Sequence, residues 1–458
     1  MSNAAGQAVI TGVVPIALLL AAILIWATSL AGVSLRPMND LGLISVLPPG
    51  FFLAAGLLTC SFCLALRSRP VNNPVLLLHV GILILFLYGT PALVEQTPRI
   101  AVTWRHIGLI DYVMHNGKLL PKFDAYFNWP GYFALGAFIT QIAGLSSLVS
   151  LAAWSNVFFN ALYLAPLGLI YRSTTRNARF VWLGLWFFYL TNWVGQDYFS
   201  PQGFDYFLYL ALIAILLGWY RSKSVHVLPI GIIRIQFQRM LPRAARSLEG
   251  HRNDEVSMQS NPWQRVGLMA AVLVIYAAMI PSHQLTPFAA LLGVGLLAIF
   301  NRITPKSLPI VMAAMVLSWT SFMAVAYFAG HLNSILGTVG AVDQNVQRGV
   351  VDRLRGSPDH MVVVHARVAM TAAVGALALA GVFRRLIAGY RDVSMVLLGV
   401  GPLFLGLAQY GGEMFLRVYF YALPALAFFA AALFFPTRAR ASVASYRVKI
   451  GPQRRRGD

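Results

Sequence analysis

Ionisable side chains gather in one stretch of an otherwise apolar chain, residues 95–130. Asp111 and His115 stand four residues apart there, a spacing that places a carboxylate and an imidazole on one face of a helix. Arg105 and His106 precede Asp111 by about a turn and a half. A carboxylate and an imidazole in reach of each other can take up and return a proton, so these residues suggest general acid–base chemistry.

A second set of chemical groups follows the predicted turn at 116–117. Lys118, Asp124, Asn128 and Trp129 supply a cation, a carboxylate, an amide and an indole within a few residues. Amide and charged groups hydrogen-bond hydroxyl and phosphate oxygens, and an indole gives a flat apolar surface. This mixture suits a phosphorylated sugar better than an apolar solute.

Three other polar groups stand at the ends of predicted membrane spans, at the depth of the 95–130 loop, so they can converge with it. An arginine at the mouth of a span suits a lipid-linked phosphate. An ordinary chain reversal around His283 and a simple ion pair at the third group are the structural alternatives. The groups are Gln196, Asp197, Gln202 and Asp205; His283 and Gln284; and Glu413 and Arg417.

Composition predicts an all-α integral membrane protein, since 58% of residues are hydrophobic, 11% are charged and the mean hydropathy is +0.68. Apolar runs long enough to cross a bilayer recur along the chain. We expect about twelve spans. They cover residues 8–30, 43–66, 74–94, 148–171, 178–194, 203–220, 265–281, 286–301, 308–329, 366–383, 393–409 and 418–436.

Charge placement predicts the orientation. Most Lys and Arg residues fall on the side that holds both termini, so we expect a multi-pass protein of the cell membrane with cytoplasmic ends. The net charge of +20 is explained by this placement and predicts no nucleic-acid partner. We divide the chain into one transmembrane domain and a basic tail. The domain is 1–436, with an external loop and interfacial helices at 95–147, a basic cytoplasmic loop at 221–265 and an external loop at 330–365; the tail is 437–458.

The apolar run at 131–143 must not cross the membrane if this orientation holds, because a crossing there would invert every later loop. We expect a half-inserted or interfacial helix.

The chain resembles the GT-C superfamily, polytopic glycosyltransferases that take a sugar from a polyprenyl phosphate. The resemblance rests on the acidic external loop with Asp111, on DAYFNWPGYFALGAF, on HQLTPF and on GGEMFLRVYFYALP. It implies that Asp111 is the base acting on the acceptor hydroxyl and that Arg417 binds the donor phosphate. The superfamily's main acidic loop commonly follows the first span, which makes Asp40 a rival base. The main loop has no DxD motif, which counts against a divalent cation (Mg²⁺ or Mn²⁺) as cofactor.

The chemistry of sugar transfer can be assigned to residues without the resemblance. A hydroxyl that attacks an anomeric carbon needs a carboxylate as base, for which Asp111 and Asp124 are available. The leaving lipid phosphate needs cations, for which Arg417, Arg105 and Lys118 are available. One base and a phosphate leaving group favour inversion. The expected partners are the bilayer, a lipid-linked donor and a glycan, lipid or protein acceptor.

Two other functions fit parts of the sequence. A secondary transporter commonly has twelve helices, but it should carry ionisable or helix-breaking residues near the bilayer midplane, whereas here they stand at the ends of spans. A membrane glycan polymerase or ligase would use the same donor on the same face, with the histidines and arginines of 331–367 facing an anionic acceptor.

Overall fold

The computed structural model describes residues 2–222, 255–330, 340, 347, 352, 355–407 and 412–435, with side chains from residue 13 onward. Within these ranges the regular elements are helices, and an isolated bridge pairs Arg221 with Ile303. The all-α class is therefore confirmed. Most of the loops predicted at 221–265 and 330–365, and the whole tail at 437–458, lie outside the described residues.

Short connecting segments join most of the consecutive helices. They are α1 (Ser2–Leu30), η1 (Gly42–Ser45), α2 (Pro49–Arg67), α3 (Asn73–Ile84), η2 (Leu85–Gly89), α4 (Thr90–Glu95), α5 (Ala101–Asn116), η3 (Ala125–Asn128), α6 (Gly131–Ile142), α7 (Val149–Ala153), α8 (Ser155–Thr174), α9 (Ala178–Thr191), α10 (Pro201–Trp219), α13 (Pro262–Ser282), α14 (Thr286–Ile299), α15 (Leu308–Phe322), α18 (Pro358–Ile387), α19 (Val393–Val400), η6 (Gly401–Leu407) and α20 (Met414–Ala432).

Seven helical segments of the described chain are long and apolar enough to cross a membrane, which supports an integral membrane protein. The predicted count of about twelve stays a prediction, because several predicted spans are shorter apolar helices. The 14 residues of α9, for example, extend about 21 Å, against about 30 Å of hydrocarbon. The seven are Val13–Leu30, Pro49–Arg67, Asn73–Glu95, Pro201–Trp219, Pro262–Ser282, Pro358–Ile387 and Met414–Ala432.

The helices α5 and α6 form a short pair at one end of the molecule. The predicted helix from residue 101 ends at Asn116, because Gly117 takes a left-handed conformation (φ 60°) that closes the helix. The 12 residues of α6 extend about 18 Å, too short to span, in agreement with the expectation for 131–143. A span predicted from 366 begins earlier, since α18 starts at Pro358.

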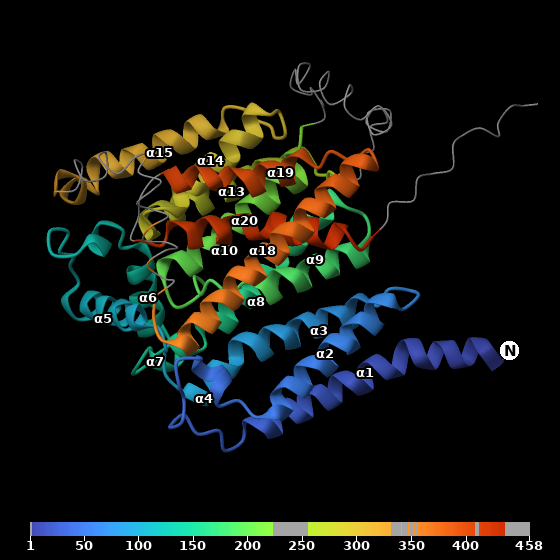
Figure 1. Ribbon diagram of the computed structural model, residues 1–458. Coiled ribbons are helices and arrows are strands. Elements are labelled where there is room, and N and C mark those ends of the chain that lie inside the picture. The colour runs from blue at the N-terminus through green and yellow to red at the C-terminus, as the bar shows by residue number, and fades with distance from the viewer. Residues whose placement is uncertain are drawn as a thin grey trace, which may run out of the picture.

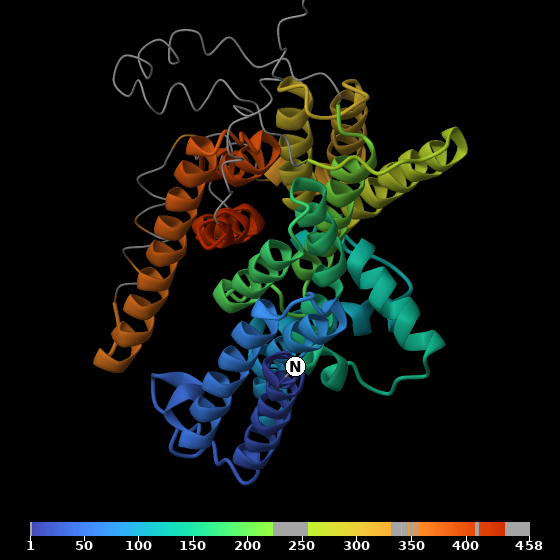
Figure 2. The same cartoon turned by 90° about the vertical axis from the view of Figure 1, so that its right-hand side faces the viewer.

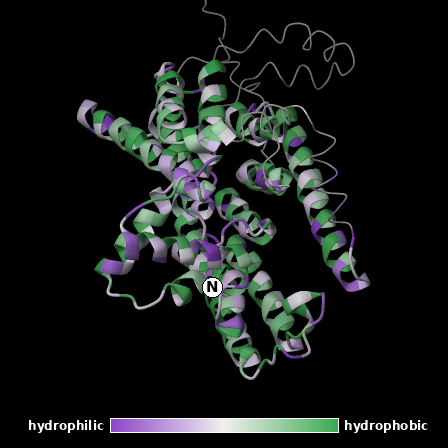
Figure 3. Cartoon of the chain, turned by 90° about the vertical axis from the view of Figure 1, so that its left-hand side faces the viewer, coloured by the Kyte–Doolittle hydropathy of each residue, from purple (hydrophilic) through white to green (hydrophobic). Residues whose placement is uncertain are grey.

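Figure 1 shows where the ends lie. The pair α5 and α6 lies at the left end, and the N-terminus and the last turns of α20 lie at the right end. Figure 2 shows α1, α2 and α3 as one group beside α8, α9 and α10, with α18 at the margin. In Figure 3 the helix bodies are mostly hydrophobic and the hydrophilic stretches are short.

A buried cluster of charges connects the end of α10 with the segment before α13. Glu255 binds both Arg221 and Arg302 at 2.5 Å, and all three side chains are less than a tenth exposed. The Ser222 backbone N–H also donates to the Arg302 carbonyl at 2.9 Å. The residues just after α10 and just before α13 are thereby held at one place.

The most enclosed helix is α20, and a tyrosine completes its backbone hydrogen bonding. Pro424 lies inside α20 and has no N–H to donate to the carbonyl of Phe420, four residues earlier. The Tyr206 hydroxyl, on α10, donates to that carbonyl at 2.9 Å, and the two rings stack at 3.8 Å. The Tyr171 hydroxyl, on α8, donates to the carbonyl of Pro424 at 2.8 Å.

A glycine allows α18 to pack directly on the α20 backbone. A Cβ at Gly381 would lie 1.8 Å from the carbonyl oxygen of Phe429. Gly375, on the same helix, has no heavy atom within 4 Å of the same position.

We therefore expect Gly381→Ala to lower the unfolding temperature in detergent, since α18 must move away from α20, a cost of about 1–3 kcal/mol for overpacking. Gly375→Ala is the matched control and should leave that temperature unchanged or slightly raised. Equal melting of both variants would show that the two helices do not meet at this point.

Candidate functional site

Tyr126, in η3, is acted on electrostatically by four charged side chains from three segments. The Arg105 guanidinium, on α5, lies 5.1 Å from the centre of its ring. Asp124, Glu413 and Arg417 also act electrostatically on its hydroxyl, whose pKa is raised mainly by burial. We call this group and its neighbours the Tyr126 cluster. It consists of Arg105, His106, Asp124, Tyr126, Gln196, Tyr198, His283, Glu413 and Arg417.

Asp124 is held by two structural contacts. Its Oδ2 accepts a hydrogen bond from Arg105 at 2.6 Å, and that bond raises the pKa of the guanidinium. Its Oδ1 accepts from the Tyr126 backbone N–H at 2.9 Å and caps η3. Asp124 therefore orients the loop and Arg105 together.

His106, on α5, is 1% exposed and packed among aromatic rings. It stacks on Tyr198 at 5.9 Å and meets the ring of Tyr126 edge-on at 5.2 Å. Its Nδ1 bonds the carbonyl oxygen of Phe199 at 2.8 Å. Burial lowers the pKa of His106 to about 4, so its ring is neutral at pH 7.

Glu413 and Arg417 bring α20 into the cluster. Arg417 lies 3.5 Å from the Glu413 carboxylate, so the predicted ion pair is confirmed. The side chain of Gln196 donates to the same carboxylate at 3.3 Å. The side chain of Arg417 is 12% exposed and that of Glu413 is 38% exposed.

The turn between α13 and α14 contributes His283. Its Nδ1 accepts from the Thr286 backbone N–H at 3.2 Å and lies 2.8 Å from the Thr286 hydroxyl, which lies 2.7 Å from the Tyr421 hydroxyl. Burial holds the pKa of His283 well below its ordinary value, and the positive charge of Arg417 acts in the same direction. Gln284, next in the chain, is half-buried.

Asp111, His115 and Lys118 lie on the exposed side of α5 and the loop after it. The buried side of α5 is formed by residues such as His106 and Ile110. The expected contact between the Asp111 carboxylate and the His115 imidazole is wrong, because His115 Nδ1 bonds the backbone carbonyl of Asp111 at 2.8 Å.

Asp40 and the 128–129 pair serve as links between segments. The carboxylate of Asp40 accepts from the Ser357 hydroxyl at the start of α18. Asn128 donates to the Pro121 carbonyl at 2.9 Å, and Trp129 packs edge-on against Tyr327 at 5.2 Å.

Asp197 is buried among three amides rather than open to the outside. Asn156 and Asn192 donate to its carboxylate at 3.1 and 3.2 Å, and Asn160 donates as well. Burial nevertheless raises the pKa of Asp197 to about 6, against the effect of the amides.

Asp205 lies one turn into α10 and is fully buried. Neither of its carboxylate oxygens has a hydrogen-bond partner among the described residues, nor has Nε2 of Gln202 on the same face. Such an acid inside a candidate span is a functional candidate in its own right.

The sequence interpretation did not single out Tyr126, Tyr421, Asn156 or Asn160 as site residues. Asn156 and Asn160 stand four residues apart in an apolar helix, and this spacing was a usable signal for a buried polar partner. The tyrosines carried no such signal, since tyrosines occur throughout the spans.

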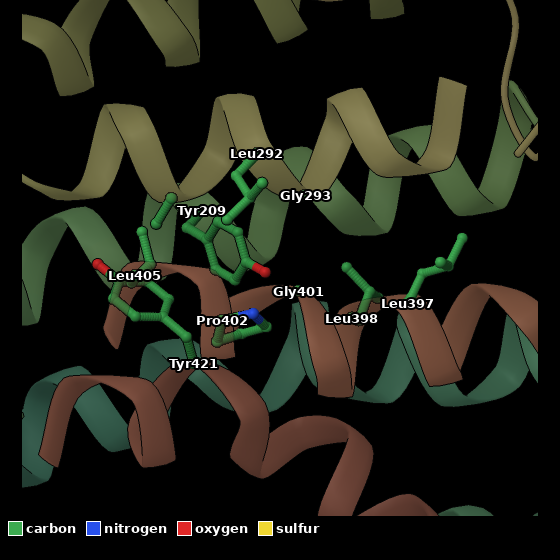
Figure 4. A pocket seen from close by; sticks show the side chains of 10 residues that line it. Tyr209, Leu292, Gly293, Leu397, Leu398, Gly401, Pro402, Leu405 and Tyr421 are labelled. Atoms are coloured by element: carbon green, nitrogen blue, oxygen red, sulfur yellow. The ribbon is translucent and has the colours of Figure 1, made fainter. Parts of the chain in front are cut away.

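No group of three or more metal-ligating side chains comes together in the described part of the chain. Figure 4 shows a cavity between α10, α14, α19, η6 and α20 that is lined mainly by apolar residues such as Leu398 and Pro402. Tyr421 lines this cavity with its ring, and its hydroxyl reaches Thr286.

The pKa of Asp197 predicts a pH dependence of stability. The folded state holds this proton more tightly than the unfolded state, whose pKa stays near the ordinary 3.8. The free energy of unfolding should therefore fall as pH rises from about 4 to about 6 and then level off. Asp197→Asn should remove this contribution, so the melting temperature of wild type minus that of the variant should decrease over the same interval. Asp111→Asn is the exposed control, and a difference independent of pH would contradict the assignment.

Comparisons with family models, with curated proteins and with solved structures find no match to this chain, so its arrangement of side chains is the basis for assigning a function.

Proposed function

We propose that this protein is a membrane glycosyltransferase that moves a sugar from a polyprenyl phosphate to an acceptor hydroxyl. The observation that carries the proposal is the Tyr126 cluster, where the ion pair of Glu413 and Arg417 at the start of α20 acts electrostatically on Tyr126, and Arg417 also acts on His283. The cluster adjoins α5 and α6, a pair too short to span, as expected for a site at the membrane surface.

The roles follow from charge and exposure. Arg417 binds the donor phosphate, since a guanidinium forms strong charge-assisted bonds to phosphate oxygens and stabilises the leaving group. Glu413 is the base, because it is the more exposed carboxylate of the cluster and lies beside Arg417. It removes the proton of the acceptor hydroxyl as that oxygen bonds to the anomeric carbon and the bond to phosphate breaks, with inversion. Asp124 positions Arg105.

The proposed location is the extracytoplasmic face of the cell membrane. The segments predicted to be cytoplasmic hold most of the Lys and Arg residues, which supports this orientation. A membrane glycan polymerase or ligase would use the same donor and the same side chains, so the identity of the acceptor would distinguish these activities from a simple sugar transfer.

One observation favours a secondary transporter as the second candidate. Asp205, buried inside α10 without a partner for its carboxylate among the described residues, has the character of a coupling site for a proton or small cation.

We expect Glu413→Gln to lower kcat for transfer from a radiolabelled polyprenyl phosphate sugar by about 10²- to 10⁴-fold, the usual effect of losing a general base. Asp111→Asn, which removes a carboxylate from the exposed side of α5, should retain activity within a few fold. The assay uses purified protein in lipid and confirms folding by thermal melting. Full activity of Glu413→Gln together with loss in Asp111→Asn would place the base on the exposed side of α5.

Arg417→Ala should raise the donor KM and lower kcat, and Arg417→Lys should restore part of both, because lysine keeps the charge and loses the bidentate geometry. A donor KM unchanged by Arg417→Ala would remove Arg417 from the phosphate site.

The transporter reading has its own test. It requires saturable uptake into sealed vesicles that Asp205→Asn abolishes, with no transfer from any donor. Transfer without uptake would exclude it.

A further inference from the structure

We propose that four exposed arginines, at the turns between α2 and α3 and between α8 and α9, bind the headgroup of an anionic phospholipid. The candidate span Asn73–Glu95 starts at the first of these turns and ends shortly before α5, so the arginines and α5 lie at opposite ends of that span. The inference is therefore independent of the proposed transfer. We call these residues the arginine patch; they are Arg67, Arg69, Arg172 and Arg176.

Hydrogen bonds hold the two turns side by side. The guanidinium of Arg179, in the first turn of α9, donates to the carbonyl oxygens of Leu66 at 2.8 Å and Ser68 at 2.6 Å. Nearly one turn later, the indole N–H of Trp182 donates to Oδ1 of Asn73 at 2.8 Å. The chain from the end of α2 to the start of α3 is thereby fixed against the start of α9.

The arginine patch has no acidic residue near it in either turn. Residues 66–73 and 171–179 contain no Asp or Glu. No member of the patch forms an ion pair with another residue of the described chain, and all four side chains are exposed. An anion can therefore bind these guanidinium groups without displacing an existing ion pair.

Two helix N-termini strengthen the positive field at the turns. Both α3 and α9 begin here, and their caps are the neutral side chains of Asn72 and Asn177. Oδ1 of Asn72 accepts from the backbone N–H of Val75 at 3.2 Å, and Oδ1 of Asn177 accepts from that of Arg179 at 3.1 Å. Helix N-termini carry a partial positive charge and favour anions, so they act in the same direction as the arginines.

The location of the patch identifies the anion as a lipid. The turn at 68–72 joins two candidate spans, Pro49–Arg67 and Asn73–Glu95, so it lies at a membrane surface among phospholipid headgroups. Basic groups between spans bind the phosphates of such headgroups. Two arginines from each turn fit a headgroup with two phosphates, as in diphosphatidylglycerol, because a guanidinium can bind two oxygens of one phosphate.

Lysine variants separate phosphate binding from topology. Arg69→Lys with Arg176→Lys (the Lys pair) keeps the positive charge that orients the chain and loses the bidentate geometry. Arg69→Gln with Arg176→Gln (the Gln pair) removes two charges. Arg36→Gln with Lys306→Gln is the matched control, because both side chains are exposed and lie outside the patch.

The experiment uses native mass spectrometry of the purified full chain in uncharged detergent. It measures the dissociation constants of diphosphatidylglycerol and phosphatidylcholine, with inorganic phosphate as a competitor. Wild type and the control should bind diphosphatidylglycerol more tightly than phosphatidylcholine. The Gln pair should weaken that binding by about 10- to 100-fold, since each basic residue contributes about 1 kcal/mol, or roughly fivefold, at an anionic headgroup. The Lys pair should weaken it by about 3- to 10-fold.

Four results would overturn the inference. They are equal affinity for the two lipids, equal weakening in the Gln pair and the control, wild-type affinity in the Lys pair, and complete displacement of the lipid by an equal concentration of inorganic phosphate. The last would assign the patch to a free anion. Thermal melting without lipid checks that each variant is folded, and if the Gln pair does not fold, the Lys pair alone decides.

Discussion

The hydrogen bond from Tyr206 to the Phe420 carbonyl is the contact on which the candidate site depends most. An unpaired carbonyl in an apolar interior is costly, and Pro424 would leave one in the middle of α20. Because α10 supplies the missing donor, α20 can carry a proline and still pack on all sides. The same helix presents Glu413, Arg417 and Tyr421, so its position sets the geometry of the site.

Polar side chains in this protein fall into two kinds. Some, such as Asp124 and Asp197, use their hydrogen-bonding capacity on neighbouring protein groups and hold segments in place. Others have a buried polar atom without a hydrogen-bond partner among the described residues, as Nε2 of His106 does. Burial alone does not distinguish them, since Asp197 and His106 are equally enclosed. The number of hydrogen-bond partners within the protein distinguishes them.

Composition and the apolar runs predicted the all-α membrane class, which follows from local properties that each segment carries. The placement of Lys and Arg along the whole chain predicted that the run at 131–143 does not cross the membrane. The sequence also marked His106, His283, Glu413 and Arg417 as site residues. The sequence did not show which side of α5 is buried. It therefore favoured Asp111, which is exposed, whereas His106 is the buried ionisable residue of this helix. Contacts between distant segments, such as Tyr421 with Thr286, have no local signature.

The buried charges between the exit of α10 and the approach to α13 also matter for those who work with the protein. Arg221, Glu255 and Arg302 hold the chain at the exit of α10 and at the approach to α13 beside each other. Closing a longer loop between fixed ends adds little free energy, since the cost grows only with the logarithm of its length. This junction is therefore the natural place to insert a small rigid domain as a marker for electron microscopy.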